Sequence, residues 1–215
     1  ELMGTYLFVV GCCIGSFINV VIYRLPLNQS IVYPNSSCPK CNSKINWFDN
    51  LPIISWFFLR GRCRVCNKKI AISYPIIELC TGLLVFFNLY ANPTIYGQQT
   101  IYETIFFGSI FIPIILTLAI LDLKYFWLPQ ALTSGGLILG ITMSLYVDFY
   151  NDFYQFSYSK HTLTASFLGL AFFYLLILVG KKIFNKPVMG GGDAKLGALI
   201  GSWLGIHGLF VSIWL

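Results

Sequence analysis

Two aspartates stand at the ends of long apolar runs, where charge is costly. Asp193 follows three glycines in MGGGDAKL, and Asp122 ends a run in LAILDLKYFWLP. Acidic residues in or beside membrane-length apolar segments are functional candidates by default. If two carboxylates lie within a few ångströms, they share one proton near neutral pH, so that the ionised one can activate a water and the protonated one can polarise a carbonyl. The two residues therefore predict a diaspartyl hydrolytic site whose protonation steps belong to the pair.

The glycines before Asp193 have a use in such a site. Without a Cβ, Gly190, Gly191 and Gly192 can take positive φ and let a peptide backbone approach the carboxylate. Two simpler interpretations stay open. Asp193 caps a helix after a flexible turn, and Asp122 is an interfacial acid beside Lys124.

A second set of residues has metal-ligand spacing. The pairs CPKC and CRVC place Cys38, Cys41, Cys63 and Cys66 in a C-x2-C…C-x2-C array with 21 residues between the pairs. Four thiolates complete a closed tetrahedral zinc site with Zn–S distances of about 2.3 Å. Such a site has no open position, so it would fold the surrounding loop and take no part in a reaction. Disulfides, an iron–sulfur cluster and unligated thiols are the alternatives, and a reducing cytoplasm disfavours disulfides.

The elements that must position these residues are membrane helices. Of the 215 residues, 57% are hydrophobic and 10% charged, whereas soluble domains carry about 25% charged residues. The sequence therefore predicts an all-α polytopic membrane protein, and because its last apolar run reaches the final residue, we expect further C-terminal residues. About six segments are long enough to cross roughly 30 Å of hydrocarbon: Leu2–Tyr23, Ala71–Ala91, Tyr102–Leu121, Gln130–Val147, Leu163–Ile183 and Leu196–Leu215.

The distribution of Lys and Arg predicts the orientation. Segments 24–70, 122–129 and 184–195, with the flanking Lys181 and Lys182, hold 13 of the 14 basic residues. The positive-inside rule puts these segments in the cytoplasm and the N-terminus outside. Both aspartates then lie at the cytoplasmic membrane boundary. We expect three parts: residues 1–23 form a transmembrane helix, 24–70 a small zinc-ribbon-like cytoplasmic loop domain, and 71–215 the helical core with the aspartates.

The cytoplasmic loop is strongly basic. It carries eight Lys or Arg residues against one acid, Asp49. Its apolar stretch LPIISWFFL, residues 51–59, is too short to span a membrane, so we expect it to lie in the interface or to pack on the helices. The simpler interpretation of the charge is that this is merely the positive-inside loop.

Taken together, these motifs resemble those of the type IV prepilin peptidases, polytopic aspartic proteases that process precursors of type IV pilins and type II secretion pseudopilins. The resemblance is spread over most of the chain. In order, it is carried by GSFINVVIYRLP (15–26), NLPIISWFFLRGRCRVC (50–66), SYPIIEL (73–79), LDLKYFWLP (121–129) and the G-x-G-D motif at 190–193, with Lys195 close behind.

The resemblance implies that Asp122 and Asp193 are the catalytic pair of an enzyme in the bacterial inner membrane. Many relatives cut a basic leader after a glycine on the cytoplasmic side and then methylate the new N-terminus with S-adenosylmethionine, and the tetracysteine loop accompanies these bifunctional members. The implied partners are prepilin or pseudopilin precursors and the lipid bilayer, with no nucleic acid. No glycine-rich nucleotide motif is visible. Glu78 and Arg24 are candidates for binding the methyl donor or the new amine, unless they form an ion pair between helices.

Two other functions fit part of the pattern. A protease of the presenilin or signal-peptide-peptidase type shares the G-x-G-D motif, but the tetracysteine loop and GSFINVVIYRLP favour the prepilin group. A small transporter with a zinc-stabilised loop would use its intramembrane acids for ion binding, near the bilayer midplane. The predicted position of the acids at the cytoplasmic edge argues against a transporter.

Overall fold

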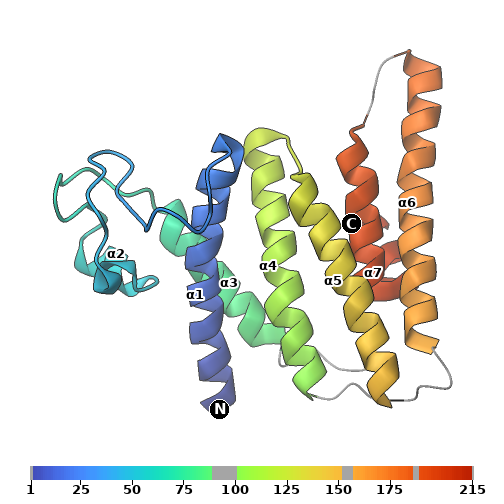
Figure 1. Cartoon of the computed structure of the whole chain (residues 1–215), viewed down its shortest axis with the longest axis horizontal. Helices are drawn as coiled ribbons and strands as arrows, with labels where there is room; N and C mark the ends of the chain where they lie inside the picture. The colour runs from blue at the N-terminus through green and yellow to red at the C-terminus, as the bar shows by residue number, and fades with distance from the viewer. Residues whose placement is uncertain (1, 89–100, 152–156, 186–188, 215) are drawn as a thin grey trace. The chain divides into compact units, whose positions relative to one another are not determined.

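The computed structural model describes residues 2–88, 101–151, 157–185 and 189–214, and helices dominate this part of the chain (Figure 1). The predicted all-α class is confirmed. The helices are α1 (Leu2–Arg24), η1 (Leu25–Leu27), η2 (Trp47–Asn50), α2 (Ile54–Phe58), α3 (Ser73–Asn88), α4 (Ile101–Tyr125), α5 (Gln130–Asn151), α6 (Ser157–Phe184) and α7 (Gly191–Trp214).

Within the described residues, five helices are long and apolar enough to cross a membrane, namely α1, α4, α5, α6 and α7. They confirm a polytopic membrane protein. The remaining predicted span, Ala71–Ala91, coincides with α3, of which 16 residues are described. Residues 89–91 of that predicted span lie outside the described part of the chain.

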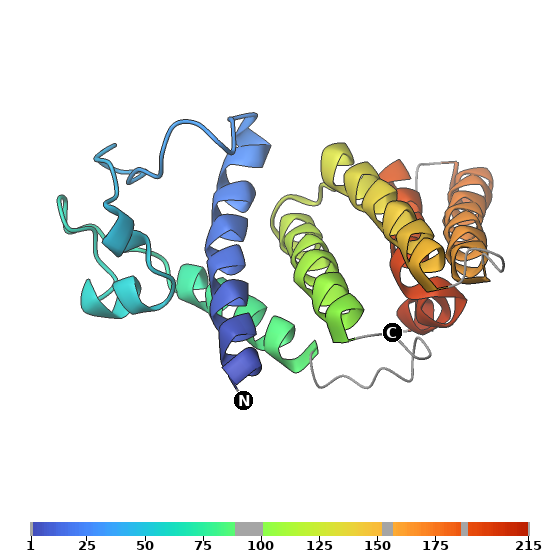
Figure 2. The ribbon, with the colours of Figure 1, turned by 60° about the horizontal axis from the view of Figure 1, so that its bottom comes forward.

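Residues Glu1–Ile120 form one compact unit, in which α1 and α3 pack antiparallel. Two glycines of α1 bring the backbones together, because a Cβ on Gly11 would lie 2.8 Å from Cα of Gly82 and one on Gly15 would lie 2.7 Å from Cα of Glu78. Small residues at such spacing let membrane helices approach closely. Nδ2 of Asn19 adds a hydrogen bond to the carbonyl of Tyr74 at 3.2 Å. Figure 2 shows the same two helices, and the chain between them, from the end of α1 to the start of α3, forms the loop.

Residues Leu121–Leu215 form a second unit, in which α5, α6 and α7 pack on one another. Its centre is Trp203, which is fully buried and donates a hydrogen bond from Nε1 to the carbonyl of Gly136 at 2.8 Å. The indole fits against α5 because Gly140 has no side chain there. Gly205, with φ of 64°, kinks α7. This bundle holds the starts of α5 and α7, which flank the predicted aspartate site.

Candidate functional site

Asp122 lies in the last helical turn of α4 and is exposed. Its carbonyl accepts a hydrogen bond from the N–H of Phe126 at 2.8 Å. Phe126 has φ of 50°, a left-handed conformation that ends the helix. Pro129 then precedes the start of α5. The sequence therefore places Asp122 beside a short, sharply defined turn.

Asp193 is the third residue of α7 and is half-buried. Its Oδ2 accepts a hydrogen bond from the N–H of Gly190 at 3.1 Å, and its own N–H donates to the carbonyl of Gly190 at 3.2 Å. This reciprocal pair resembles the capping box, in which an acidic residue in the first turn satisfies a free N–H at the helix start. The carboxylate also faces the positive end of the helix dipole. In this structure, Asp193 therefore caps the N-terminus of α7.

The turn after Asp122 contacts the start of α7. A Cβ placed on Gly192 would lie 3.1 Å from Cβ of Leu128, so the glycine leaves room for the leucine side chain. Asp122 and Asp193 therefore flank one packing contact at the same end of the second unit. Among the described residues, no hydrogen bond joins the two carboxylates, and both remain accessible.

Gly190, Gly191 and Gly192 do not use the positive φ that is open to glycine. The glycines with positive φ in the described chain are Gly61 and Gly205. The reason is that α7 already begins at Gly191, so Gly191 and Gly192 have helical backbone. Gly191 borders open space, since a Cβ there would meet nothing within 4 Å.

The structure brings the four predicted metal-ligating cysteines together in the loop. The sulfur atoms of Cys38, Cys41, Cys63 and Cys66 all lie within 4.8 Å of one another, and those of Cys38 and Cys66 are 3.9 Å apart. Sulfurs around a tetrahedral zinc ion at 2.3 Å would be roughly 3.8 Å apart. The cysteines are free thiols. The donor set and its spacing therefore fit a single thiolate-bound metal ion.

Each cysteine pair lies on a turn of the same construction. In the first turn, the N–H of Cys38 donates to the carbonyl of Ser43, and the N–H of Asn42 donates to that of Cys38. The second turn repeats this pattern from Cys63 to Lys68, with Asn67 in the place of Asn42. Both asparagines have positive φ, near 55°. Two equivalent turns thus present two sulfurs each to one point.

Hydrogen bonds in these turns favour the metal-binding thiolate form at Cys63 and Cys41, whereas desolvation and hydrogen bonds with the neighbouring thiols raise the pKa of Cys66 to about 11. The backbone N–H groups of Cys66 and Val65 lower the pKa of the Cys63 thiol to about 6. The hydroxyl of Ser43, 3.0 Å from Sγ of Cys41, lowers the pKa of the Cys41 thiol.

The structure does not bring Glu78 and Arg24 together. Oε2 of the buried Glu78 accepts a hydrogen bond from the N–H of Ile53 at 2.7 Å. The buried Arg24 donates to the carbonyls of Ser30 and Asn35. The described chain contains no ion pair between Glu78 and Arg24, so that alternative is wrong. Each residue instead holds part of the loop.

Sequence reasoning missed three contacts around these sites. The first is between Glu78 and Ile53, and the second is between Leu128 and Gly192. Both contacts join residues far apart in the chain, and no local sequence pattern indicated either contact. The third is the ion pair between Asp49 and Arg64, at 2.6 Å. A signal for it existed, because Asp49 is the single acid of a basic loop.

Two family models match the chain. Residues 9–92 match the bacterial peptidase A24 N-terminal domain, and residues 109–215 match the type IV leader peptidase family. The first match contains the cysteine turns and Glu78, and the second contains both aspartates. No solved structure matches the chain.

Curated relatives extend these matches over nearly the whole chain. A prepilin leader peptidase/N-methyltransferase of Myxococcus xanthus is 38% identical over 94% of this chain and 56% of its own length. Proteins of the same name from Neisseria gonorrhoeae and Klebsiella pneumoniae are 34% and 32% identical, over 95% and 97% of this chain and 75% and 88% of their own lengths. The chain thus spans little more than half of the Myxococcus protein and most of the other two.

Proposed function

Because the chain belongs to the type IV prepilin leader peptidase family, we propose that it is a membrane aspartic endopeptidase that removes the basic leader of type IV prepilins or pseudopilins. Asp122 and Asp193 are its catalytic pair. The observation that carries this assignment is the contact between Leu128 and Gly192, which joins the turn after one aspartate to the helix that begins with the other. The family matches favour this function over a presenilin-type protease or a transporter.

The reaction follows from two carboxyl groups that share one proton. The ionised carboxylate removes a proton from water as the oxygen attacks the scissile carbonyl carbon, and the protonated partner donates its proton to the carbonyl oxygen. Collapse of the tetrahedral intermediate breaks the C–N bond. The carboxyl group that took up the water proton donates it to the leaving amine, and the other carboxylate regains its proton from the hydroxyl that becomes the new carbonyl oxygen. The open space beside Gly191 supports access of a peptide backbone to Asp193.

The basic loop supports a cytoplasmic site in the bacterial inner membrane, with the N-terminus outside. A prepilin carries a basic leader ahead of an apolar helix. Its scissile bond therefore lies at the inner membrane boundary, the level proposed for the aspartates. The partners are the precursor and the bilayer.

We assign zinc to the four cysteines, since four converging thiolates with no open position are typical of structural zinc. The ion would cross-link the two turns and thereby fix the loop. Cys38, Cys41, Cys63 and Cys66 would hold it.

N-methylation of the new N-terminus, with S-adenosylmethionine as donor, is the proposed second activity. It rests on the names of the relatives. Glu78 and Arg24 are the proposed donor ligands, and both also form hydrogen bonds with the loop backbone.

The test is mass spectrometry of a purified prepilin incubated with the protein in detergent, which reports leader loss and methyl addition together. Asp122→Asn and Asp193→Asn should each lower the cleavage rate by about a thousandfold or more. Asp49→Asn, which removes an acid from the other unit, is the matched control and should cleave normally. Cleavage that survives either of the first two substitutions would eliminate the assignment.

A further inference from the structure

Residues 47–58 of the loop present large apolar side chains that the protein does not cover. Trp47 is 78% exposed, Ile54 55%, Phe57 66% and Phe58 85%. They belong to η2 and α2, which contact each other. In an aqueous domain, such a group of exposed aromatic residues would mark a binding surface.

The segment lies beside the helices α1 and α3, at a level within their length. It is attached to α3 by the 2.7 Å hydrogen bond from the N–H of Ile53 to Oε2 of Glu78. Glu78 packs directly against Gly15, nine residues before the end of α1 at Arg24, which is about 14 Å along a helix axis. Side chains on a helix lean toward its N-terminus, and the N-terminus of α3 lies near the end of α1. The carboxylate of Glu78 therefore lies less than about 14 Å from the level where α1 ends. Figures 1 and 2 both show α2 beside the middle of α1, not beyond its end.

The backbone at Ile53 is held in one conformation. Ile53 has φ of 61°, which is rare for a β-branched residue and costs free energy. The bond to the buried carboxylate of Glu78 stabilises that conformation. Because Ile53 immediately precedes α2, this turn fixes where Phe57 and Phe58 lie.

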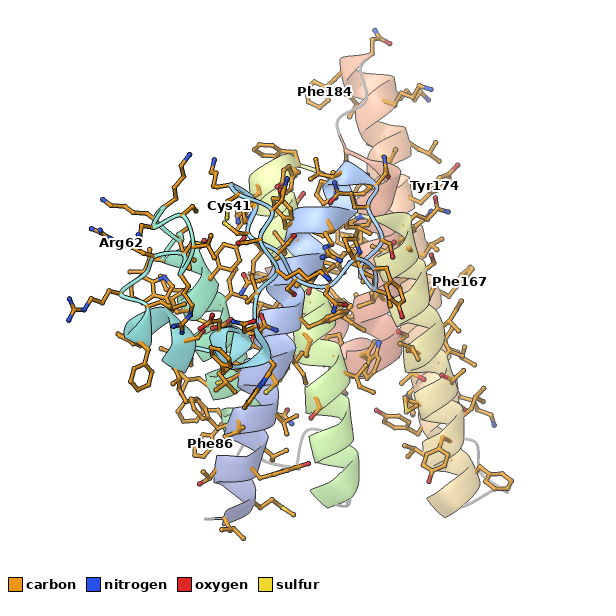
Figure 3. The ribbon with its side chains drawn as sticks, turned by 60° about the vertical axis from the view of Figure 1, so that its left-hand side comes forward. Cys41, Arg62, Phe86, Phe167, Tyr174 and Phe184 are labelled. Carbon is orange, nitrogen blue, oxygen red and sulfur yellow. The ribbon has the colours of Figure 1, made fainter. Side chains whose placement is uncertain are left out.

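Basic side chains follow the apolar segment. Within 60–69, the exposed ones are Arg60, Arg62, Arg64, Lys68 and Lys69. Figure 3 shows Arg62 pointing outward from the loop. The one acid of the loop, Asp49, is already paired with Arg64. The surface next to the apolar segment therefore has uncompensated positive charge.

We propose that residues 47–58 form an interfacial membrane anchor. Trp47, Ile54, Phe57 and Phe58 enter the acyl-chain region below the headgroups, in the leaflet where α1 ends. The neighbouring Arg and Lys side chains bind anionic phospholipid headgroups. Exposed aromatic residues beside basic ones are the composition of elements that lie in the membrane interface, and each basic residue near an anionic surface adds attraction. The level of Ile53 within the helix pair favours lipid over an aqueous partner.

The experiment uses the full chain in liposomes and a matched pair of positions. A fluorescent amino acid replaces either Phe57 or Val32, as Phe57→acridonylalanine or Val32→acridonylalanine. The two side chains are similarly exposed, at 66% and 67%, but Val32 lies outside both the apolar segment and the cysteine turns. Lipids brominated on the upper acyl chain should quench position 57 roughly twofold or more above position 32, and aqueous iodide should show the opposite order. Adding phosphatidylglycerol to phosphatidylcholine should increase the difference.

Three results would overturn the anchor. The first is equal iodide quenching at both positions with no bromolipid quenching. The second is protection of position 57 that grows with protein-to-lipid ratio, which would assign the surface to a second copy. The third is protection only with added prepilin, which would assign it to substrate. None of these readouts measures cleavage, so the proposed peptidase activity is judged separately.

Discussion

The cysteine cluster is assembled differently from the aspartate end, which is the end of the second unit where Asp122 and Asp193 lie. The four cysteines come from two equivalent turns of one loop, and their sulfurs already lie within 4.8 Å of one another. The aspartates come from helices separated in the chain by α5 and α6. One leucine packed beside one glycine connects their surroundings, and no hydrogen bond joins the carboxylates in the described residues.

The difference follows from what each site is proposed to do. A structural metal site works when its ligands are complete and closed, so local turns suffice to build it. A hydrolytic site must admit a peptide and a water, and its two acids stand on separate helices, α4 and α7, where both are accessible. Changes to the first should therefore act on the loop, and changes to the second on turnover.

Removal of one cysteine should have the largest effect. Cys63→Ser leaves three thiolates, and zinc affinity should fall by several orders of magnitude, because structural sites depend on the full ligand set. Elemental analysis of the purified protein should find about one zinc per chain in the unchanged protein and close to none in the variant. Cys80→Ser is the control, since Cys80 is a free, exposed cysteine outside the cluster. Equal metal content in all three proteins would contradict the assignment.

Gly192→Val tests the aspartate end. The added carbons would collide with Leu128, since even a Cβ at this position would lie 3.1 Å from Cβ of Leu128. We expect kcat/KM for leader cleavage to fall about tenfold to a hundredfold, because small displacements of catalytic groups are costly. Zinc content should not change.

Two further variants sharpen this result. Gly135→Val adds the same side chain to α5, where a Cβ meets nothing within 4 Å, and cleavage should stay close to normal. Leu128→Ala combined with Gly192→Val should recover part of the lost activity. If Gly135→Val is as harmful as Gly192→Val, the contact with Leu128 is not what matters.

Local features of the sequence were sufficient for the all-α class, the membrane helices and the cysteine cluster. Apolar length predicts a membrane helix directly, and C-x2-C spacing limits how far apart two thiolates can lie. The contacts of Ile53 with Glu78 and of Leu128 with Gly192 could not be predicted, because they depend on how distant segments pack. The start of α7 inside the glycine run was not predicted either, because the last predicted span begins at Leu196 and α7 begins at Gly191. The catalytic roles of Asp122 and Asp193 stay predictions.

Glu78→Ala tests how the loop is held to the first helix pair. It leaves the N–H of Ile53 without its acceptor, which should cost about 1–3 kcal/mol. Glu78→Gln keeps a carbonyl oxygen in place and should cost less. Thermal unfolding in detergent measures both. If Glu78→Ala abolishes methylation while stability is unchanged, Glu78 serves the methyl donor and does not anchor the loop.

Asp49→Asn should have the smallest effect. The carboxylate accepts two hydrogen bonds from Arg64, at 2.6 and 2.8 Å, but the arginine side chain is 55% exposed. Exposed pairs contribute about 0.2–1 kcal/mol and are screened by salt. The guanidinium also lies over the ring of Phe48, 5.3 Å from its centroid, and that contact can persist without the carboxylate.

The readout for Asp49→Asn is the rate of zinc loss to a chelator. At low salt the variant should lose zinc at most about fivefold faster than the unchanged protein, and at high salt the two rates should converge. This is expected because the two cysteine turns are closed by their own backbone hydrogen bonds, and the ion pair only ties η2 to the second turn. If zinc loss is instead as fast as in Cys63→Ser, the cluster depends on contacts outside its turns. The cysteine cluster would then resemble the aspartate end, as a site assembled by packing between distant segments.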